Sequence, residues 1–289
     1  RDERLPVALY TEDEPAIVSP AYFMFEIIDN SVLDENYLMM WFRRPEFDRI
    51  CWLHTDGSVR GGITWEDICR LELPVPPIQE QRKIVKAYKI ITDRIELKKR
   101  INDNLEATAQ ALFKENFSVE NANSEWAVGT LQDIYTFQYG KGNNNPDNGG
   151  CYPVYGSNGI IGGFDEYNNE DAPVIGHIGI NCGSLVFAFG KHFVTYNGVM
   201  CNIKNPAHKY FGYLTLTNSR LQAQVRGSSQ PFVSYDDRYE QTKMFDSVRM
   251  GLEYFERKIT PFFDQIASNQ KEKNELVKLQ DILLSELTS

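Results

Sequence analysis

The apolar residues of this chain follow a helical spacing in two long segments. Between residues 77 and 117, and again between residues 250 and 289, they recur every three or four positions. This spacing is typical of an α-helix with one apolar face. The stripe positions are Ile84, Ile91, Ile95, Leu105 and Leu112 in the first segment and Ile259, Phe262, Ile266, Leu276 and Leu283 in the second. Each stripe is too long for one small domain to cover, so the pattern favours two helices that pair with each other.

Polar residues interrupt both stripes at the same place. Lys98 and Asn102 interrupt the first stripe, Asn269 and Lys273 interrupt the second, and a shift of 171 positions superimposes them. Polar residues at core positions set the register of coiled coils. We therefore expect an antiparallel pair in which Lys98 lies near Lys273 and Asn102 lies near Asn269. The alternative is that each helix packs on its own globular segment, as most amphipathic helices do.

A loop outside the helices also occurs twice. Residues 57–67 and residues 227–237 both contain Gly-Ser, a short connection, a β-branched residue, a hydroxyl residue, an aromatic residue and an acidic pair. Such a repeat predicts two similar modules, each followed by one of the long helices. Residue 1 aligns near residue 172, so residues 126 to about 171 have no counterpart in the first module. We expect a first module that is incomplete at its N-terminal end, either by truncation or by nature.

The remaining segments predict short strands and short helices. Runs of β-branched and aromatic residues between turn signals are typical of strands, and they occur at residues 5–28, 152–163, 174–179 and 184–189. Residues 71–75 are expected to form a strand or an extended piece. Short helices are expected at residues 36–42, started by Asp34, and at residues 210–224. Thr64 and Asp67 form a predicted capping box.

Together these segments predict an α+β fold in four parts. Two modules of mixed β structure with short helices are separated by two long antiparallel helices. The parts are residues 1–76, 77–117, 118–249 and 250–289. Pro261 is expected to kink the second helix or to mark its true start, because proline lacks the backbone donor that a helix interior needs.

Composition describes an ordinary globular chain with an uneven charge. Hydrophobic residues make up 42% and charged residues 24%, and no apolar run approaches the roughly 18 residues of a membrane span. The net charge of -10 argues against a nucleic-acid partner. However, residues 1–76 hold 7 basic and 15 acidic side chains, whereas residues 78–116 hold 9 and 6. The five cysteines lack the paired spacing of a zinc site, and we expect reduced thiols in a cytoplasmic protein without a metal or cofactor.

Catalytic patterns are scarce. The sequence contains no phosphate-binding loop of the Gly-x-x-x-x-Gly-Lys-Ser/Thr type and no His-Glu-x-x-His. His177, Cys182 and His192 are close in sequence, which allows a cysteine nucleophile with a histidine base. A buried structural thiol is the ordinary alternative for a cysteine in such a glycine-rich region.

Glycine-rich loops give a stronger signal for binding. Glycine lets the backbone approach a partner, while Asn, Gln, Lys and Arg side chains can contact base edges or phosphates. The alternative for each residue is a solvated turn. The candidate DNA contacts are Lys141, Asn143, Tyr155, Ser157, Asn158, Arg226, Ser228, Gln230, Ser58 and Arg60.

Three segments make the pattern specific to one family. Residues 76–85 read Pro-Pro-Ile-Gln-Glu-Gln-Arg-Lys-Ile-Val, residues 104–113 read Asn-Leu-Glu-Ala-Thr-Ala-Gln-Ala-Leu-Phe, and residues 153–160 read Pro-Val-Tyr-Gly-Ser-Asn-Gly-Ile. With the repeated Gly-Ser loop, they resemble the DNA-specificity (S) subunit of Type I restriction–modification enzymes. The resemblance covers nearly the whole chain.

The resemblance implies a function as well as a fold. It implies two target-recognition domains, each similar to the recognition domain of an adenine-N6 methyltransferase, held apart by an antiparallel pair of helices. Such a subunit has no catalysis of its own and reads a bipartite site in double-stranded DNA. It docks two methyltransferase subunits, and restriction and translocase subunits join the complex.

The helix length fits this expectation, with one departure. A helix over residues 78–114 spans roughly 55 Å at 1.5 Å per residue, which exceeds one DNA turn of about 34–36 Å. Two modules could therefore face separate half-sites. The second helix begins Met-Gly-Leu-Glu at residues 250–253 and lacks the Pro-Pro-x-x-Glu-Gln start of the first. The alternatives are a coiled-coil scaffold without DNA recognition and a hydrolase that uses Cys182.

Overall fold

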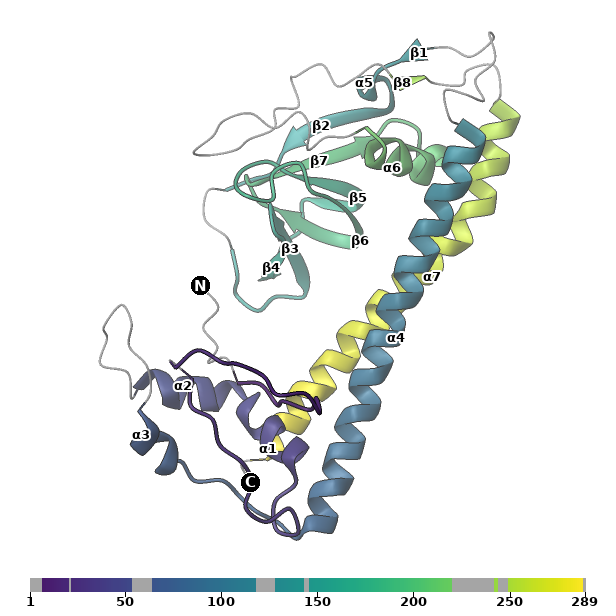
Figure 1. Ribbon diagram of the computed structural model, residues 1–289. Helices are drawn as coiled ribbons and strands as arrows, with labels where there is room; N and C mark the ends of the chain where they lie inside the picture. The colour runs from purple at the N-terminus through teal and green to yellow at the C-terminus, as the bar shows by residue number, and fades with distance from the viewer. Residues whose placement is uncertain are drawn as a thin grey trace. The chain divides into compact units, whose positions relative to one another are not determined.

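The structure, a computed structural model, describes residues 7–20, 22–53, 64–117, 128–142, 146–219, 242–243 and 249–287. The chain divides into two compact units: unit 1 consists of residues 1–100 and 269–289, and unit 2 of residues 101–268. The long helices α4 (Ile78–Phe117) and α7 (Arg249–Glu286) each contribute one part to each unit (Figure 1).

Unit 1 contains three short helices, and the first of them packs against the unit's parts of α4 and α7. These are α1 (Glu35–Phe42), α2 (Pro45–Leu53) and α3 (Trp65–Cys69). As the sequence predicts, the Asp34 side chain caps α1, and Thr64 forms a capping box with Asp67 at the start of α3. The core joins the aromatic face of α1 to both long helices, through Tyr37, Met40, Tyr88, Leu284 and Leu287.

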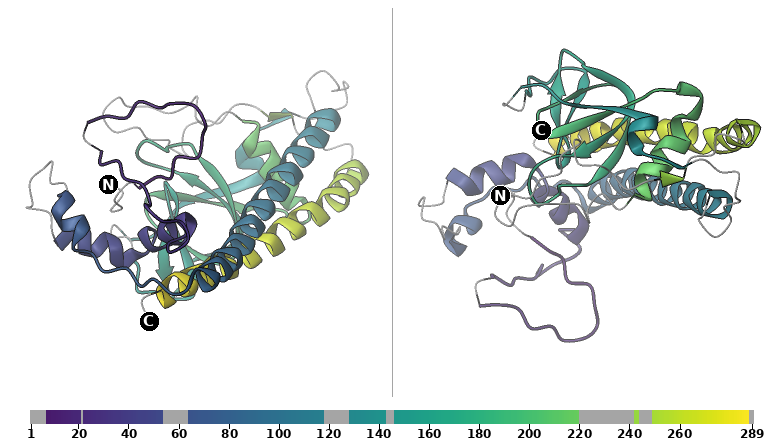
Figure 2. Two further views of the ribbon diagram at one scale, coloured as in Figure 1. Left: turned by 60° about the horizontal axis from the view of Figure 1, so that its bottom comes forward. Right: turned by 90° about the horizontal axis from the view of Figure 1, so that it is seen from above.

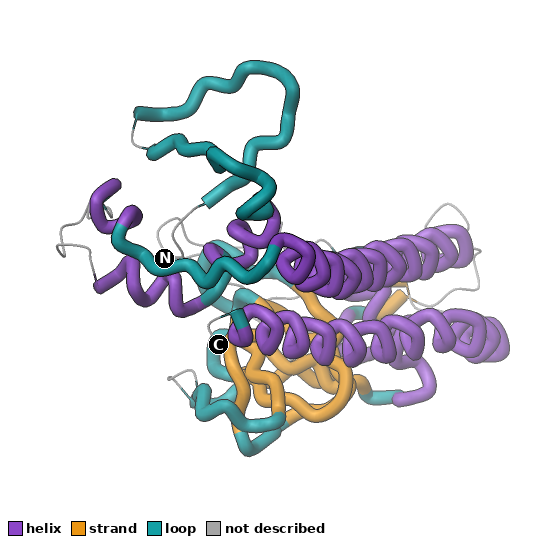
Figure 3. Tube along the Cα trace, turned by 90° about the horizontal axis from the view of Figure 1, so that it is seen from below, coloured by secondary structure: helices purple, strands orange, loops and turns teal. Residues whose placement is uncertain are grey.

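The strands predicted for the first module are not observed. Residues 7–20, 22–28 and 71–75 are irregular, and all strands of the described residues belong to unit 2 (Figure 3). Ile17 and Ile28 are fully exposed, at 102% and 101%. A strand needs a hydrogen-bonded neighbour. The shift of 171 maps residues 14–23 and 27–32 onto two strands of unit 2, and the partner strands of these two at residues 135–139 and 152–156 have no counterpart in the sequence of unit 1.

Unit 2 is built on a six-stranded mixed sheet. Its strands are β2 (Tyr135–Tyr139), β3 (Tyr152–Gly156), β4 (Gly159–Phe164), β5 (Asn169–Gly176), β6 (Leu185–Val194) and β7 (Gly198–Ile203). The order is β2-β7-β5-β6-β3-β4, with β3 and β6 parallel and the other neighbours antiparallel. The short pieces are β1 (Val128–Gly129), α5 (Leu131–Ile134), the 3-10 turn η2 (Pro206–His208), α6 (Lys209–Thr217) and β8 (Thr242–Lys243), which pairs with β1.

Helix α6 joins the sheet of unit 2 to the long helices (Figure 2). Tyr210 of α6 stacks on Phe263 of α7 with ring centroids 4.2 Å apart and planes 6° apart. Tyr210 and Tyr213 also contact Phe187 of β6. The buried Glu256 of α7 accepts hydrogen bonds from the backbone N–H groups of Tyr210 and Phe211 (2.7 and 2.9 Å), which satisfies donors at the start of α6. The expected helix 210–224 is therefore observed as a shorter helix, and residues 220–224 lie outside the described residues.

The two long helices are antiparallel, but the expected pairing of Lys98 with Lys273 is wrong. In unit 1, Lys98 donates to Oδ1 of Asn269 (2.9 Å) and lies 2.8 Å from a carboxylate oxygen of Glu272, rather than facing Lys273. In unit 2, Asn102 donates to the backbone oxygen of Ile266. The observed register gives the Lys98 amine an amide and a carboxylate, whereas the predicted one would have placed two ammonium groups together.

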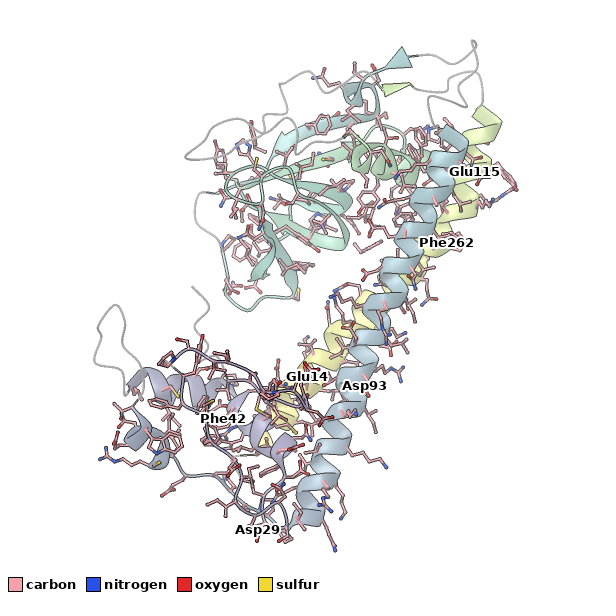
Figure 4. All side chains as sticks on the ribbon, in the orientation of Figure 1. Glu14, Asp29, Phe42, Asp93, Glu115 and Phe262 are labelled. Carbon is pink, nitrogen blue, oxygen red and sulfur yellow. The ribbon has the colours of Figure 1, made fainter. Side chains whose placement is uncertain are left out.

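On α7 the expected stripe position Ile259 is fully buried, whereas at two other expected positions the neighbouring residue is the buried one. Phe263, at 1% exposure, is the buried aromatic of this stretch, whereas Phe262 is half-buried (Figure 4 labels Phe262). Leu284 and Leu287 likewise lie in the core of unit 1, while Leu283 is half-buried. Helix α7 runs through Pro261, so Pro261 does not mark its start.

Candidate functional site

Four connecting segments of unit 2 are tied together beside the ends of β2, β3, β5 and β6, and we call them the loop cluster. They are residues 139–142, 156–158, 177–184 and 195–197. The N–H of Lys141 donates to the carbonyl of Val194 (3.0 Å). The carbonyl of Asn197 accepts from both Oγ of Ser157 (2.7 Å) and the N–H of His177 (2.8 Å). Each connection is thereby fixed by at least one other.

Glycines make this close approach possible. A Cβ at Gly140 would lie 2.1 Å from the backbone oxygen of Thr195, and a Cβ at Gly176 would lie 2.7 Å from Oγ of Ser184. Gly179 and Gly183 have φ values of 94° and 79°, which L side chains rarely adopt. The glycine density that the sequence analysis associated with binding therefore also has a packing role.

Three aromatic side chains form one wall of the loop cluster. The ring of Tyr139 lies 4.5 Å from that of His177 and 5.8 Å from that of Tyr196. His177 and Tyr196 meet edge to face at 5.8 Å. His177 is buried, but Tyr196 is 42% exposed. An exposed ring on a supported base can stack on a partner or pack against it at little entropic cost.

The outermost part of the loop cluster is polar with one apolar residue. Nδ2 of Asn181 donates to Oδ1 of Asn158 (2.7 Å), which joins the β3–β4 turn to the β5–β6 connection. Next to Asn181 in sequence, Ile180 is 93% exposed. Oγ of Ser157 also accepts from the N–H of Ile178 (3.2 Å). Sequence reasoning chose Asn158 but missed Ile180, Asn181 and Tyr196, because nothing in their local sequence shows which turns converge.

The structure places four of the ten candidate DNA contacts. Lys141 and Asn158 are exposed on the loop cluster, and Ser157 is half-buried, with its hydroxyl engaged in the cluster. Tyr155 is 7% exposed and packs in the sheet core, where burial raises the pKa of its hydroxyl to about 12. The other six, Asn143, Arg226, Ser228, Gln230, Ser58 and Arg60, lie outside the described residues.

The candidate nucleophile is buried, and its thiol is bonded to the backbone. Cys182 is 5% exposed, and its thiol donates to the backbone oxygen of His177 (3.1 Å). His192 is fully buried, with Nδ1 2.8 Å from the carbonyl of Gly190 and its ring against Tyr155. Burial lowers the pKa of His192. The thiol is thus held as a structural donor.

Neither a metal site nor a membrane span is found in the part of the chain that the structure covers. Within residues 7–20, 22–53, 64–117, 128–142, 146–219, 242–243 and 249–287, no three His, Cys, Asp or Glu side chains are grouped to hold a metal ion. The helices of the same residues include none that is both long and apolar enough to cross a membrane.

The Pro-Pro-Ile-Gln-Glu-Gln segment has a structural purpose that its sequence did not reveal. Gln81 is fully buried. Its Oε1 accepts from the N–H of Asp34 (2.8 Å), and its Nε2 donates to the carbonyls of Val32 (2.8 Å) and Pro76 (2.7 Å). This side chain joins the start of α4 to the start of α1. Because Gln81 satisfies three backbone groups in the interior, its role in this segment is structural.

Comparisons with known proteins agree with these observations. Residues 8–107 match the family described as the Type I restriction modification DNA specificity domain. The chain is thus similar to specificity subunits of Type I restriction–modification enzymes. It is 25% identical to the Type I restriction enzyme MjaIX specificity subunit of Methanocaldococcus jannaschii, over 90% of this chain and 70% of that protein.

A solved structure supports the same fold. The S subunit of a Type I restriction–modification system from M. genitalium matches this chain with a TM-score of 0.52 and 20% identity. The match covers 90% of this chain and 74% of the other. The resemblance found in the sequence is confirmed, and so is the α+β class with its long helices.

Proposed function

We propose that this chain is the DNA-recognition subunit of a Type I restriction–modification assembly and that it catalyses no reaction itself. The observation that carries the proposal is the specificity-domain match at residues 8–107, together with the relatedness of nearly the whole chain to a specificity subunit. The loop cluster supports it, because a rigid surface with exposed amides, an exposed lysine and an exposed aromatic ring suits contact with nucleic acid. The buried thiol of Cys182 supports the non-catalytic part.

The proposed partners are double-stranded DNA, two methyltransferase subunits and, through the complex, restriction and translocase subunits. In unit 1, apolar side chains remain exposed on the long helices. Ile90 and Leu97 of α4 are 58% and 49% exposed and lie two turns apart on one face, and Leu279 and Ile282 of α7 are 49% and 52% exposed. Exposed apolar groups gathered on a helix are typical of protein interfaces. We propose them as the surface on which a methyltransferase subunit docks.

The proposal includes the bipartite nature of the DNA site. Residues 1–76 and 118–249 are the proposed recognition segments, and residues 77–117 and 250–289 the proposed spacer helices. Helix α4 contains 40 residues, or about 60 Å at 1.5 Å per residue. Deleting matching turns from both helices is expected to change the spacer between half-sites and leave the half-site sequences intact. An unchanged spacer in the methylated motif would refute the proposal that helix length sets the distance between the half-sites.

The central experiment is reconstitution with the methyltransferase subunits. The purified complex should select a bipartite duplex, and its affinity should fall with rising salt because phosphate contacts release counterions. Methylome sequencing of cells carrying the system should then show methylated adenines flanking an unread gap. The net charge of -10 favours the alternative, a helical scaffold without DNA recognition. A complex that assembles but binds all duplexes equally, or none, would support that alternative.

Docking can be tested separately from DNA recognition. Replacing Ile90 and Leu97 by serine is expected to weaken copurification with the methyltransferase subunit without unfolding the chain, because both side chains are largely exposed. The matched control replaces exposed Lys86 and Lys89 on α4 by serine. Equal copurification of the Ile90 and Leu97 variant would remove this surface from the proposal.

A further inference from the structure

Two amide side chains at the tip of the loop cluster together offer a donor and an acceptor. The hydrogen bond between them uses Nδ2 of Asn181 as donor and Oδ1 of Asn158 as acceptor. This leaves Nδ2 of Asn158 as a donor and Oδ1 of Asn181 as an acceptor, and both residues are exposed. In the described part of the chain neither remaining group has another side-chain partner. The pair therefore presents a defined pattern to a ligand.

The pair is held rigidly before any ligand arrives. The N–H of Cys182 donates to the carbonyl of Gly179 (2.9 Å), and the N–H of Ser184 donates to the carbonyl of Asn181 (3.0 Å), so the connection is folded on itself. On the other side, Oγ of Ser184 donates to the carbonyl of Ser157 (3.1 Å), which fixes the turn that carries Asn158. Preorganised donors and acceptors lose little entropy on binding, which favours a specific contact.

One base edge in duplex DNA matches this pattern. In the major groove adenine presents N7 as an acceptor and N6 as a donor, and Asn side chains bind these atoms as a pair. Guanine presents two acceptors, N7 and O6, and would leave the Asn181 oxygen facing another oxygen. Ile180, which adjoins Asn181 and is 93% exposed, is the kind of group that packs on the thymine methyl.

We propose that Asn158 and Asn181 jointly read the adenine edge of an A·T pair in the major groove, and that Ile180 contacts the thymine methyl of the pair. Lys141, exposed on the same loop cluster, contacts a phosphate beside it. This inference rests on the proposed function, since it requires unit 2 to bind duplex DNA. It adds the identity of one base pair in the half-site and the residues that select it.

The test uses the complete complex with its methyltransferase subunits. Its motif is first determined with the unaltered chain. Each adenine of the motif is then replaced by 7-deazaadenine, which removes N7, and each thymine by uracil, which removes the methyl. One A·T pair should weaken binding under both replacements. The Asn158→Ala and Asn181→Ala variants should bind the motif about 5- to 100-fold more weakly. Asn158→Ala should also no longer respond to 7-deazaadenine at that pair, because the free donor that faces N7 is Nδ2 of Asn158.

Two further variants keep the test independent of folding. Ile180→Ala alters an almost fully exposed side chain, and it should abolish the response to uracil while keeping the response to 7-deazaadenine. The control Gln132→Ala changes an exposed amide on α5, outside the loop cluster, and should behave as the unaltered chain. If an asparagine variant fails to fold, the analogue scan of the unaltered complex and Ile180→Ala still decide the matter.

The outcomes separate this inference from the proposed function. A complex that selects a motif, but whose variants keep the same response at every A·T pair, overturns the inference and leaves the function standing. A motif half-site without any A·T pair sensitive to both analogues has the same consequence. A complex with no sequence preference at all overturns the proposed function.

Discussion

Lys98 donates a hydrogen bond to Asn269, the residue 171 positions further along the chain, with 2.9 Å between Nζ and Oδ1. The same offset of 171 superimposes the polar interruptions of the two helix stripes, and the Gly-Ser loops at residues 57–67 and 227–237 repeat with an offset of 170. A residue and its own repeat equivalent are thus in contact, as expected near the centre of an antiparallel pair of equivalent helices. Lys98 also forms an ion pair with Glu272 (2.8 Å), which in turn binds Arg94. The polar interruption is therefore a partnered cluster in the helix interface.

Replacing Asn269 by alanine is expected to destabilise unit 1 by about 1–3 kcal/mol. Asn269 is 1% exposed, and its loss leaves the partly buried Lys98 ammonium with one partner fewer. Thermal and urea unfolding followed by circular dichroism measure the change. The control Asn274→Ala removes an exposed amide of the same helix and should shift stability by less than about 0.5 kcal/mol.

The double variant Lys98→Met with Asn269→Leu tests whether the cluster specifies register rather than stability. Replacing both polar partners by apolar groups can be neutral or stabilising, so this variant should regain most of the stability lost in Asn269→Ala. It should also no longer specify a single helix register, and light scattering would detect the alternative pairings as additional oligomers. A strictly monomeric double variant that is as unstable as Asn269→Ala would contradict the register role.

Acid should weaken the same cluster through Glu272. Hydrogen bonds from Lys98 and Arg94 lower the pKa of this carboxyl below its ordinary value of 4.5. The unfolded chain therefore binds the proton first as pH falls, so the stabilisation is present above pH 4.5 and disappears as pH drops through the folded pKa. We expect Glu272→Gln to be less stable than the unaltered chain at pH 7 and to lose less stability between pH 5 and 3. Parallel melting curves at both pH values check this, and equal slopes for the two chains would count against it.

Phe263 and Phe262 provide a matched pair for the core of unit 2. Phe263 is 1% exposed and stacks on Tyr210, whereas Phe262 is half-buried. Phe263→Ala is expected to cost about 3–5 kcal/mol, because it removes a buried ring and leaves a cavity. Phe262→Ala should cost clearly less. Chemical unfolding of both variants measures the difference, and a larger effect for Phe262→Ala would show that the stripe deduced from the sequence is the correct one.

These residues show how far the sequence could predict the fold. Period alone located both long helices, and the caps at Asp34 and Thr64 were correctly identified, because both signals are local. Register was not predictable, since a stripe that recurs every three or four residues fits several alignments one turn apart. Whether Phe262 or Phe263 is buried depends on α6, because α6 packs on Phe263 although the two segments are distant in sequence.

The sequence pointed to connecting loops as the candidate site, but it did not show which residues of these loops converge. Two of the residues chosen from the glycine-rich loops, Asn158 and Lys141, are exposed on the loop cluster, and their contact with DNA stays a prediction. The convergence of Asn181, Ile180 and Tyr196 depends on the strand order β2-β7-β5-β6-β3-β4, which no local pattern specifies. Gln81 was missed because a glutamine in a polar helix start is ordinarily exposed, and only the path of residues 32–34 makes it a buried link.

Thiol reactivity distinguishes the structural cysteine from a catalytic one. Cys182 is 5% exposed and its thiol is bonded to a backbone oxygen, whereas Cys69 and Cys151 are exposed. A maleimide should therefore modify Cys69 and Cys151 in the native chain well before Cys182, since access limits the reaction. Mass spectrometry of tryptic peptides over time gives the order.

The functional counterpart is Cys182→Ser in the reconstituted complex. A serine hydroxyl can still donate to the carbonyl of His177, so DNA selection and adenine methylation should remain within about twofold of the unaltered chain, the size of an effect below roughly 0.5 kcal/mol. Cys201→Ser is the control for burial alone, because Cys201 is fully buried and also bonded to a backbone oxygen. Rapid modification of Cys182 in the native chain, combined with loss of a measured activity in Cys182→Ser but not in Cys201→Ser, would instead assign that thiol a chemical role and reopen the hydrolase alternative.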